Sequence, residues 1–457
     1  MTRPAASPDF GVEDVAEGLN SVLFSTGARA ILYEKISNTV HAGSRAHLQQ
    51  LQGRVESVPY CPAYEAESLR KTSCDAFGGL VLEVTERCDL ACSYCIYSGR
   101  YSNQRRESSS CMTLETARMA VDLFMSRAAE PALISFYGGE PLNNMPLIND
   151  TVAYCRDTQP ARSMSFSMTT NFVNADRHFE SIVKNNMFLV VSLDGPETIH
   201  DRHRRLKNGR PTWRRIMRNL SELDDYAPGF VRNHVGFSAT CVEPSDFPLV
   251  VEFFDRHPDF KLFRIGGCET KGLGPGLHAD RSAYSLSPLA RSYYESVVHN
   301  QLIPDAARVI IEPQLRTIAR RGQERMPAAL TLNGACYPGN RKLFVETDGA
   351  LYMCEKIGRR RTIGHVAYGL SKASIDGAID EYTSIRNDLC RRGCWAQRLC
   401  TPCVESAKDP AGGFSVTGLY QTCGGSKHML LVCLGLYATL ASERGDYLAH
   451  LREPTYH

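Results

Sequence analysis

The sequence lacks a long hydrophobic run and a surplus of charge of one sign. No run reaches the roughly 18 apolar residues that a membrane-spanning helix needs. Its 52 Lys and Arg residues nearly balance 50 Asp and Glu residues, so we expect neither nucleic acid nor a membrane as a partner. Residues 1–10 carry no apolar stretch of a signal peptide. We therefore expect a cytoplasmic protein.

Cysteine, in contrast, is abundant, with 17 residues in a chain of 457. Thiols stay reduced in the cytosol, so disulfides are not expected there. An odd number also excludes complete pairing. Grouped cysteines in such a chain are more typical of metal ligands.

The first part of the chain, residues 1–76, contains no chemical motif. Two short apolar runs, at 23–24 and 31–33, predict short strands, and the polar stretch 44–53 predicts a helix. We expect these residues to form a separate N-terminal segment, a possible module for binding a peptide leader.

From residue 77 the pattern becomes an alternation of short apolar runs and amphipathic segments. The runs predict strands over 80–85, 132–137, 164–170, 188–193, 234–240 and 261–265. The segments between them predict helices over 113–129, 146–157, 176–186, 212–225 and 246–257. Such alternation is typical of an α/β fold with a parallel sheet, either doubly wound or an incomplete barrel. In both, functional loops lie at the carboxyl ends of the strands.

Beyond residue 330 the alternation stops, and Gly, Cys and Arg become dense up to Cys423. The apolar stretch 429–440 predicts a helix. We expect a core over 77–300, a bridging region over 301–330 and a Cys-rich domain over 331–457.

The first group of cysteines comes directly after the first predicted strand of the core. It reads Cys88-Asp-Leu-Ala-Cys92-Ser-Tyr-Cys95. Three thiolates this close can hold a [4Fe–4S] cluster, which normally takes four, and would leave one iron open for another ligand. The alternative is half a zinc site or structural thiols, although zinc sites favour cysteines in paired arms.

This C-x3-C-x2-C spacing after the first strand of a β/α series resembles the radical S-adenosylmethionine (SAM) superfamily. Gly138-Gly139-Glu140-Pro141, at the end of the second strand, matches that family's Gly-Gly-Glu-Pro element, which holds the SAM amino group. The resemblance implies a partial (β/α)6 barrel of the TIM type. It also implies reductive cleavage of SAM to a 5′-deoxyadenosyl radical.

Two further strand ends add to the resemblance. Thr170 and Asn171 end the third strand, and the stretch from Ser192 to Asn208 resembles a Ser-Leu-Asp-Gly-Pro…His-Asp…Arg signature of peptide-modifying members. By that resemblance, Ser192 and Asp194 contact SAM and Arg204 pairs with its carboxylate, a sound bidentate contact. Arg204 could equally be one solvated charge of a basic run.

Two alternatives remain for side chains near these motifs. Tyr94 lies where the family has an aromatic residue beside the adenine, or else packs against the barrel rim. His200 and His203 could suggest a metal site, but the motif already accounts for His200 as part of a turn.

The second array of cysteines resembles the SPASM domain of radical SAM peptide maturases and anaerobic sulfatase maturases. It reads C-x12-G-x4-C, a gap, then C-x3-C-x5-C-x2-C-x19-C. This chain exchanges the usual two- and three-residue gaps and lengthens the last. By resemblance, one auxiliary [4Fe–4S] cluster takes Cys390, Cys394, Cys400 and Cys423, and another takes Cys336, Cys354 and Cys403. The alternative is a pair of zinc ribbons, for which seven cysteines are too few.

The resemblance provides no fourth ligand for the Cys336 set. Either a remote thiol is the fourth ligand, with Cys268 as the first candidate, or one iron stays open for a substrate cysteine. The other cysteines are expected to be mostly buried small apolar residues: Cys61, Cys74, Cys111, Cys155, Cys241 and Cys433.

The resemblance thus implies an oxidoreductase with three [4Fe–4S] clusters, SAM as cosubstrate and a flavodoxin- or ferredoxin-type electron donor. We expect its substrate to be a ribosomally made precursor peptide that receives a thioether or carbon–carbon crosslink. The first alternative is a sulfatase maturase that forms formylglycine. The second, a non-catalytic iron–sulfur or zinc protein, leaves the motifs at the strand ends unexplained. No Asp or Glu stands out as a catalytic acid or base.

Overall fold

The fold is taken from a computed structural model, which describes residues 8–57, 60–101, 104–267, 285–331, 336–359, 361–391, 393–409 and 413–453. Its centre is a ten-stranded sheet in the order β11-β10-β9-β8-β7-β6-β13-β14-β15-β16. Six neighbouring strands are parallel and follow one another in chain order. They are β6 (Phe77–Thr85), β7 (Ala128–Gly138), β8 (Met164–Thr170), β9 (Phe188–Ser192), β10 (Val235–Cys241) and β11 (Lys261–Gly267).

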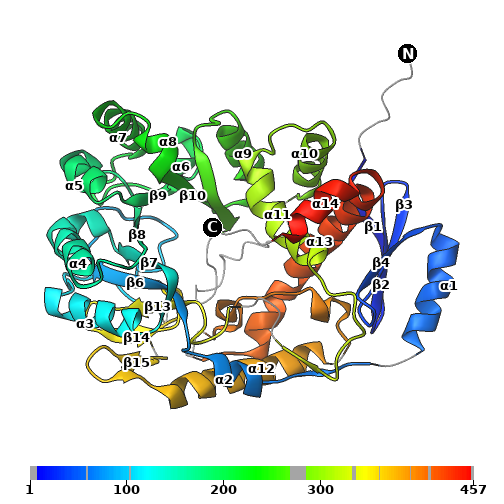
Figure 1. The fold of residues 1–457 in the computed structure, drawn as a ribbon. Coiled ribbons are helices and arrows are strands. Elements are labelled where there is room, and N and C mark those ends of the chain that lie inside the picture. The colour runs from blue at the N-terminus through cyan, green and yellow to red at the C-terminus, as the bar shows by residue number, and fades with distance from the viewer. Residues whose placement is uncertain are drawn as a thin grey trace.

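Helices cover the outer face of this curved sheet (Figure 1). Each connection between parallel strands carries at least one of them, as right-handed crossovers require. They are α3 (Leu114–Met125), α4 (Met145–Thr158), α5 (Phe179–Lys184), α6 (Glu197–His203), α7 (Trp213–Tyr226), α8 (Phe230–His234) and α9 (Phe247–Asp255). Sequential strand order with β11 at the open edge confirms the partial barrel and excludes the doubly wound alternative.

The six predicted strands are all present, with shifts of a few residues at their ends. The predicted helix over 176–186 is split into a 3-10 turn (Ala175–Arg177) and α5. Thr113, whose capping motif is incomplete, still caps α3, because its Oγ1 accepts a hydrogen bond from Thr116 N at 3.1 Å.

The Cys-rich part of the chain extends the barrel sheet. Strand β13 (Lys342–Val345) pairs with β6 in parallel, and β14 (Ala350–Tyr352), β15 (Gly364–His365) and β16 (Gly369–Leu370) continue antiparallel. Helix α12 (Lys372–Cys390) follows. The sheet therefore runs continuously from the core into the residues after 331, and the division at the predicted bounds stays a prediction.

The N-terminal segment is richer in strands than its apolar runs predict. A four-stranded antiparallel sheet contains β1 (Val12–Glu17), β2 (Ser21–Thr26), β3 (Arg29–Glu34) and β4 (Thr39–Gly43), and α1 (Arg45–Glu56) packs on it. Strands β1 and β4 escape detection because their residues are mostly exposed or half-buried. The segment 60–76 adds α2 (Glu67–Thr72) and β5 (Ala63–Tyr64), which pairs with β12 (Ala329–Leu330).

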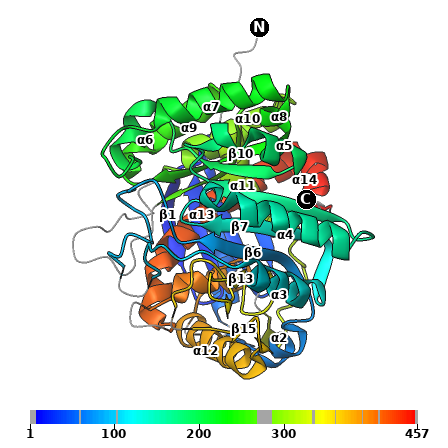
Figure 2. The ribbon, with the colours of Figure 1, turned by 90° about the vertical axis from the view of Figure 1, so that its left-hand side faces the viewer.

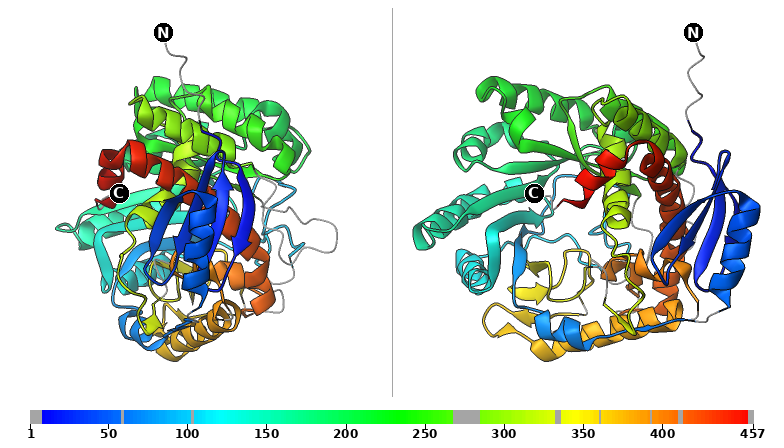
Figure 3. Two further views of the ribbon diagram at one scale, coloured as in Figure 1. Left: turned by 90° about the vertical axis from the view of Figure 1, so that its right-hand side faces the viewer. Right: turned by 45° about the vertical axis from the view of Figure 1, so that its right-hand side comes forward.

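Helix α13 (Val416–Glu443) joins the N-terminal sheet to the barrel. It packs on one side against α10 (Ser287–Val298) and α11 (Asp305–Ala319) and on the other against β1–β4 (Figures 1 and 3). The short helix α14 (Gly445–Arg452) follows it. Gly435 lets β2 approach, since a β-carbon there would come within 2.8 Å of Thr26 Cγ2. No helix in the described part of the chain is long and apolar enough to cross a membrane.

One prediction for the C-terminal half is too short. The helix predicted over 429–440 is the buried half of α13, which begins at Val416 and includes Cys423. The bridging region 301–330 contains α11, which tolerates Pro313 inside it.

Figure 2 shows the layers from the side, with α12 and the C-terminal strands below the barrel.

Candidate active site and cysteine groups

The first three cysteines lie in the loop that follows β6, at the carboxyl ends of the parallel strands. Cys95 N donates to Cys92 O at 3.1 Å, which folds the loop back on itself. Burial raises the pKa of Cys88 to about 12 and of Cys95 to about 11. The charge of a nearby Cys92 thiolate also raises the pKa of each of these thiols. The three sulfurs are therefore close together and only partly exposed.

Gly138 and Gly139 hold the end of β7 against this loop. Gly138 has a φ of +138°, and a β-carbon on either glycine would overlap a carbonyl oxygen, of Thr85 or of Arg87. Gly139 N and Glu140 N donate to these same two oxygens, each at 2.8 Å. The glycines thus permit close contact between β7 and the base of the cysteine loop.

Glu140 is buried beside the cysteine loop. Its carboxylate accepts hydrogen bonds from Thr170 Oγ1 at 2.6 Å, Asn171 N at 2.7 Å and Leu142 N at 3.1 Å. Burial nevertheless raises its pKa to about 7, because the three hydrogen bonds offset only part of the desolvation. A cation such as the SAM ammonium would favour the ionised form. Asn171 Nδ2 lies 3.9 Å from Cys88 Sγ, so the second and third strand ends meet at the cysteine loop.

A chain of hydrogen bonds joins Tyr94, Asp194 and Arg204. Tyr94 OH donates to Asp194 Oδ2 at 2.5 Å and accepts from Arg204 Nη1 at 2.7 Å, while Thr240 N donates to Asp194 Oδ1 at 2.9 Å. Burial raises the pKa of the Asp194 carboxyl and of Tyr94. Arg204 lies 5.9 Å from the centre of the Tyr94 ring.

Arg204 is buried with donors to spare. Arg204 is 8% exposed. Its Nε has no hydrogen-bond partner, and its guanidinium makes no ion pair within 4.0 Å with any described residue. The alternative of a solvated charge is therefore wrong. A buried guanidinium with an unused donor fits a ligand carboxylate, as SAM binding requires.

His200 and Asp201 support this arrangement from behind. His200 Nδ1 accepts from Asp194 N at 3.2 Å, and its Nε2 lies 3.0 Å from Thr212 Oγ1. Burial holds the pKa of His200 well below its usual value, so it is a neutral hydrogen-bonding residue. Asp201 Oδ1 accepts from Thr212 N and from Trp213 N and thereby caps α7. These roles explain the His-Asp pair without a metal.

The remaining predicted SAM contacts stand nearby. Ser192 is the half-buried last residue of β9, and Pro141 begins the 3-10 helix η1 (Pro141–Asn144). Phe172, directly after Asn171, has a φ of +61°. Whether these residues touch SAM stays a prediction.

The later cysteines gather in two groups, divided as the resemblance implies. In the first, Cys336 and Cys403 are hydrogen-bonded to each other and Cys354 lies beside them. The thiol of Cys403 lowers the pKa of Cys336, and burial raises that of Cys354. The side chain of Lys342 binds Glu355 at 2.9 Å at the edge of this group.

In the second group, Cys390, Cys394, Cys400 and Cys423 are mutual neighbours. Burial raises the pKa of Cys390 to about 12 and of Cys400 and Cys423 to about 11. Two buried cations face this group. Arg386 is 1% exposed and binds Cys400, and Lys35 is fully buried, beside Cys390 and 3.5 Å from Cys61 Sγ.

The described side chains hold no group of three or more His, Cys, Asp or Glu that is tight enough for a single metal ion. In a [4Fe–4S] cluster each thiolate binds a different iron, so its ligands need not converge on one point. The fourth-ligand candidate Cys268 lies outside the described residues.

One buried charge cluster has no counterpart in the motifs. Arg105, fully buried, pairs with Glu83 of β6 at 3.5 Å and with Glu346, after β13, at 3.2 Å. Burial raises the pKa of Glu83 to about 8. Arg105 thus ties the loop after Cys95 to the C-terminal strands, and no short-range pattern could predict this.

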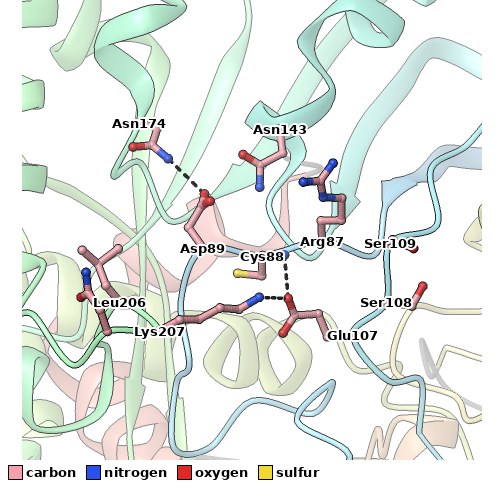
Figure 4. A pocket seen from close by; sticks show the side chains of 11 residues that line it. Arg87, Cys88, Asp89, Glu107, Ser108, Ser109, Asn143, Asn174, Leu206 and Lys207 are labelled. Atoms are coloured by element: carbon pink, nitrogen blue, oxygen red, sulfur yellow. Dashed lines mark hydrogen bonds and ion pairs between the residues drawn. The ribbon is translucent and has the colours of Figure 1, made fainter.

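A polar hollow of about 690 Å³ lies on the surface side of the cysteine loop (Figure 4). Cys88 lines it, whereas Glu140, Asp194 and Arg204 do not. Cys88 N donates to Glu107 Oε1 at 3.3 Å, and Lys207 pairs with the same carboxylate. Asn174 Nδ2 donates to Asp89 Oδ2 at 3.1 Å on the other side.

Comparison with known proteins finds a family match and related enzymes. Residues 82–239 match the model of the radical SAM superfamily. A cysteine-type anaerobic sulfatase-maturating enzyme of Clostridium novyi (strain NT) is 24% identical over 69% of this chain and 87% of its own length.

Two solved structures share the fold. The enzyme anSMEcpe with bound AdoMet has a TM-score of 0.63 at 19% identity, over 82% of this chain and 97% of its own. Streptococcus suis SuiB bound to the precursor peptide SuiA has a TM-score of 0.51 at 12% identity, over 90% of this chain and 98% of its own.

Proposed function

We propose that this chain, a radical SAM enzyme by its matching domain and related to the anaerobic sulfatase maturases, crosslinks a ribosomally made precursor peptide. The observation that carries the SAM site is the buried Arg204, whose unused Nε lies within the same hydrogen-bonded group as Tyr94 and Asp194.

Cys88, Cys92 and Cys95 would hold the first cluster, and Glu140 would stabilise the SAM amino group while Arg204 binds its carboxylate. When bound, the reduced cluster supplies the electron that cleaves SAM to a carbon radical. The chain's own part is to position SAM and exclude water. Glu140 and Arg204 both lie near the Cys92 thiol, which suits a ligand with separate amino and carboxylate ends.

Cys390, Cys394, Cys400 and Cys423 would hold one auxiliary cluster and Cys336, Cys354 and Cys403 another. Their separation into two groups by side-chain contact supports three clusters in all. The first auxiliary group has three cysteines in the described part of the chain. An iron left open there could bind a substrate cysteine and lower its pKa, which favours a thioether; Cys268 as fourth ligand is the alternative.

The N-terminal sheet is our candidate for binding the peptide's leader. In the described residues β4 pairs only with β3, so its other edge offers backbone donors and acceptors for strand addition. Strand β1 is less suitable, because the side chains of Arg45 and Gln52 already donate to its carbonyl oxygens at Asp14 and Ala16. The structure of anSMEcpe has no counterpart for nearly a fifth of this chain. The structure of SuiB, solved with a precursor peptide, covers a larger share of this chain.

Formylglycine formation on a sulfatase remains the second candidate, because the sulfatase-maturating relative spans 69% of the chain. The test gives reduced, reconstituted enzyme and SAM two substrates: the precursor peptide encoded next to its gene, and a cysteine-containing sulfatase peptide. We expect the precursor peptide to lose two hydrogen atoms by mass spectrometry and the sulfatase peptide to stay unchanged. Formylglycine in the sulfatase peptide alone would refute crosslinking.

Leader binding is tested separately by hydrogen exchange. Added precursor peptide should protect the amides of β4 (Thr39–Gly43), while those of β1 exchange as before. If neither strand gained protection while the peptide was still bound, this sheet would not be the leader-binding site.

A further inference from the structure

The surface above the cysteine loop is built from two chain segments that lie side by side. Residues 203–211 run antiparallel to residues 88–93, with Ala91 N donating to Arg205 O at 2.9 Å and Lys207 N donating to Asp89 O at 3.1 Å. Both segments are anchored on their inner side by SAM-site residues. Their outer side faces solvent.

The exposed residues of this region are strongly basic. Six exposed cations occur in residues 87–110 and 205–211, against two acidic residues, Asp89 and Glu107. The cations are Arg87, Arg100, Arg106, Arg205, Lys207 and Arg210. The whole chain carries a net charge of only +2, so this small surface, which we call the basic patch, holds more positive charge than the chain as a whole.

The charges of the basic patch are largely uncompensated. Among the described residues, Lys207 alone of the six makes an ion pair, with Glu107. A stability role would pair such charges, whereas a field of one sign attracts a charged partner. Such a surface suits a partner with an acidic face.

The basic patch also borders a hollow that reaches the first cysteine group. The hollow of Figure 4 is lined by Cys88 together with Arg87 and Lys207, and Glu107 links Lys207 to Cys88 N. Electron transfer weakens steeply with distance, so a carrier seated here would be favourably placed. The hollow contains none of Glu140, Asp194 and Arg204, so this approach does not pass through the SAM site.

We infer that the basic patch is the docking surface of a small one-electron carrier protein with an acidic face, such as a flavodoxin. The inference rests on the proposed function, since it assumes a cluster at Cys88, Cys92 and Cys95. Steering of this kind raises association rates by about ten- to a thousandfold and weakens as salt is added.

The experiment uses the full-length, reconstituted enzyme without peptide and measures 5′-deoxyadenosine formed from SAM. The electron source is either reduced flavodoxin at a limiting concentration or photoreduced deazaflavin, a small reductant that needs no docking surface. The test variant is Arg106→Glu with Arg210→Glu. The control is Arg232→Glu with Arg256→Glu, which changes the net charge equally on exposed residues that precede β10 and β11, at the opposite ends of the strands.

At low salt we expect the test variant to lose about ten- to a hundredfold of the flavodoxin-driven rate, while its deazaflavin-driven rate stays within about twofold. The control variant should keep both rates. Added salt should slow the wild type with flavodoxin but leave the test variant nearly unchanged.

An unchanged flavodoxin-driven rate in the test variant, or an equal loss in the control, would overturn the docking surface. A wild type that makes no 5′-deoxyadenosine with deazaflavin would instead refute the proposed function, so the two failures are distinguishable.

Discussion

Replacement of Arg204 should weaken SAM binding far more than replacement of its neighbour Arg202. Arg204 is buried, and its Nη1 already donates to Tyr94 OH at 2.7 Å, while Nε is unused. Removing one partner of a buried, hydrogen-bonded charge pair costs about 2–5 kcal/mol. For Arg204→Met this corresponds to a dissociation constant for SAM raised about 30-fold to several thousandfold.

The control is Arg202→Met, because Arg202 belongs to the same basic run but its side chain is 43% exposed and pairs with Asp246 at 2.8 Å. Such a surface pair contributes only about 0–1 kcal/mol to stability, and the acidic partners of Arg202 are residues that follow β10. We therefore expect SAM affinity within about twofold of the wild type.

Binding is measured by anaerobic calorimetry on reconstituted protein, with iron content and circular dichroism to establish that each variant is folded and loaded. Arg204→Lys should lie between the two, because it keeps the charge but loses the fork that binds a carboxylate at two points. If folded, loaded Arg204→Met bound SAM within about threefold of the wild type, Arg204 would not hold the carboxylate.

Three further predictions concern residues at the three cysteine groups. Glu140, with a pKa raised to about 7, is protonated at low pH, so the SAM ammonium should bind more tightly as pH rises from about 6 to about 8. Glu140→Gln should lose this pH dependence of SAM binding. A difference in SAM affinity between the two proteins that does not change with pH would contradict the prediction. Lys35→Met should lower the reduction potential of the cluster at the second auxiliary group by on the order of 50 mV, about 1 kcal/mol for one electron, because a buried cation stabilises the reduced form. Paramagnetic resonance during a redox titration measures this, and equal shifts in all clusters would argue against a local effect. Cys336→Ala should lose about four iron atoms yet retain SAM binding, which iron analysis and calorimetry check; loss of both would place Cys336 in the SAM site.

The parallel strands were predictable because buried strands of a parallel sheet give short, continuous apolar runs. The strand ends were predictable too, because motifs such as Gly138–Pro141 occupy the loops where parallel sheets place their functional residues. The grouping of the later cysteines also followed the family spacing, despite the exchanged gaps.

Features that depend on contacts between residues far apart in the chain could not be predicted from the sequence. Arg105 meets Glu346, which is 241 residues away, so no local pattern reveals the pair. The basic stretch 202–210 reads as uniform, yet tertiary contacts bury Arg204 and leave Arg205 exposed. Helix α13 was underestimated because its first half, which carries Cys423 and three glycines, has few apolar residues to mark it.

Iron and sulfide counting on anaerobically reconstituted protein tests the central claim most directly. The account predicts about twelve iron and twelve sulfide per chain, the content of three [4Fe–4S] clusters. Replacing Cys88, Cys92 and Cys95 together with Ala should remove about a third of the iron and all SAM cleavage. Tightly bound zinc without sulfide, or iron that stays complete in the triple variant, would contradict the account.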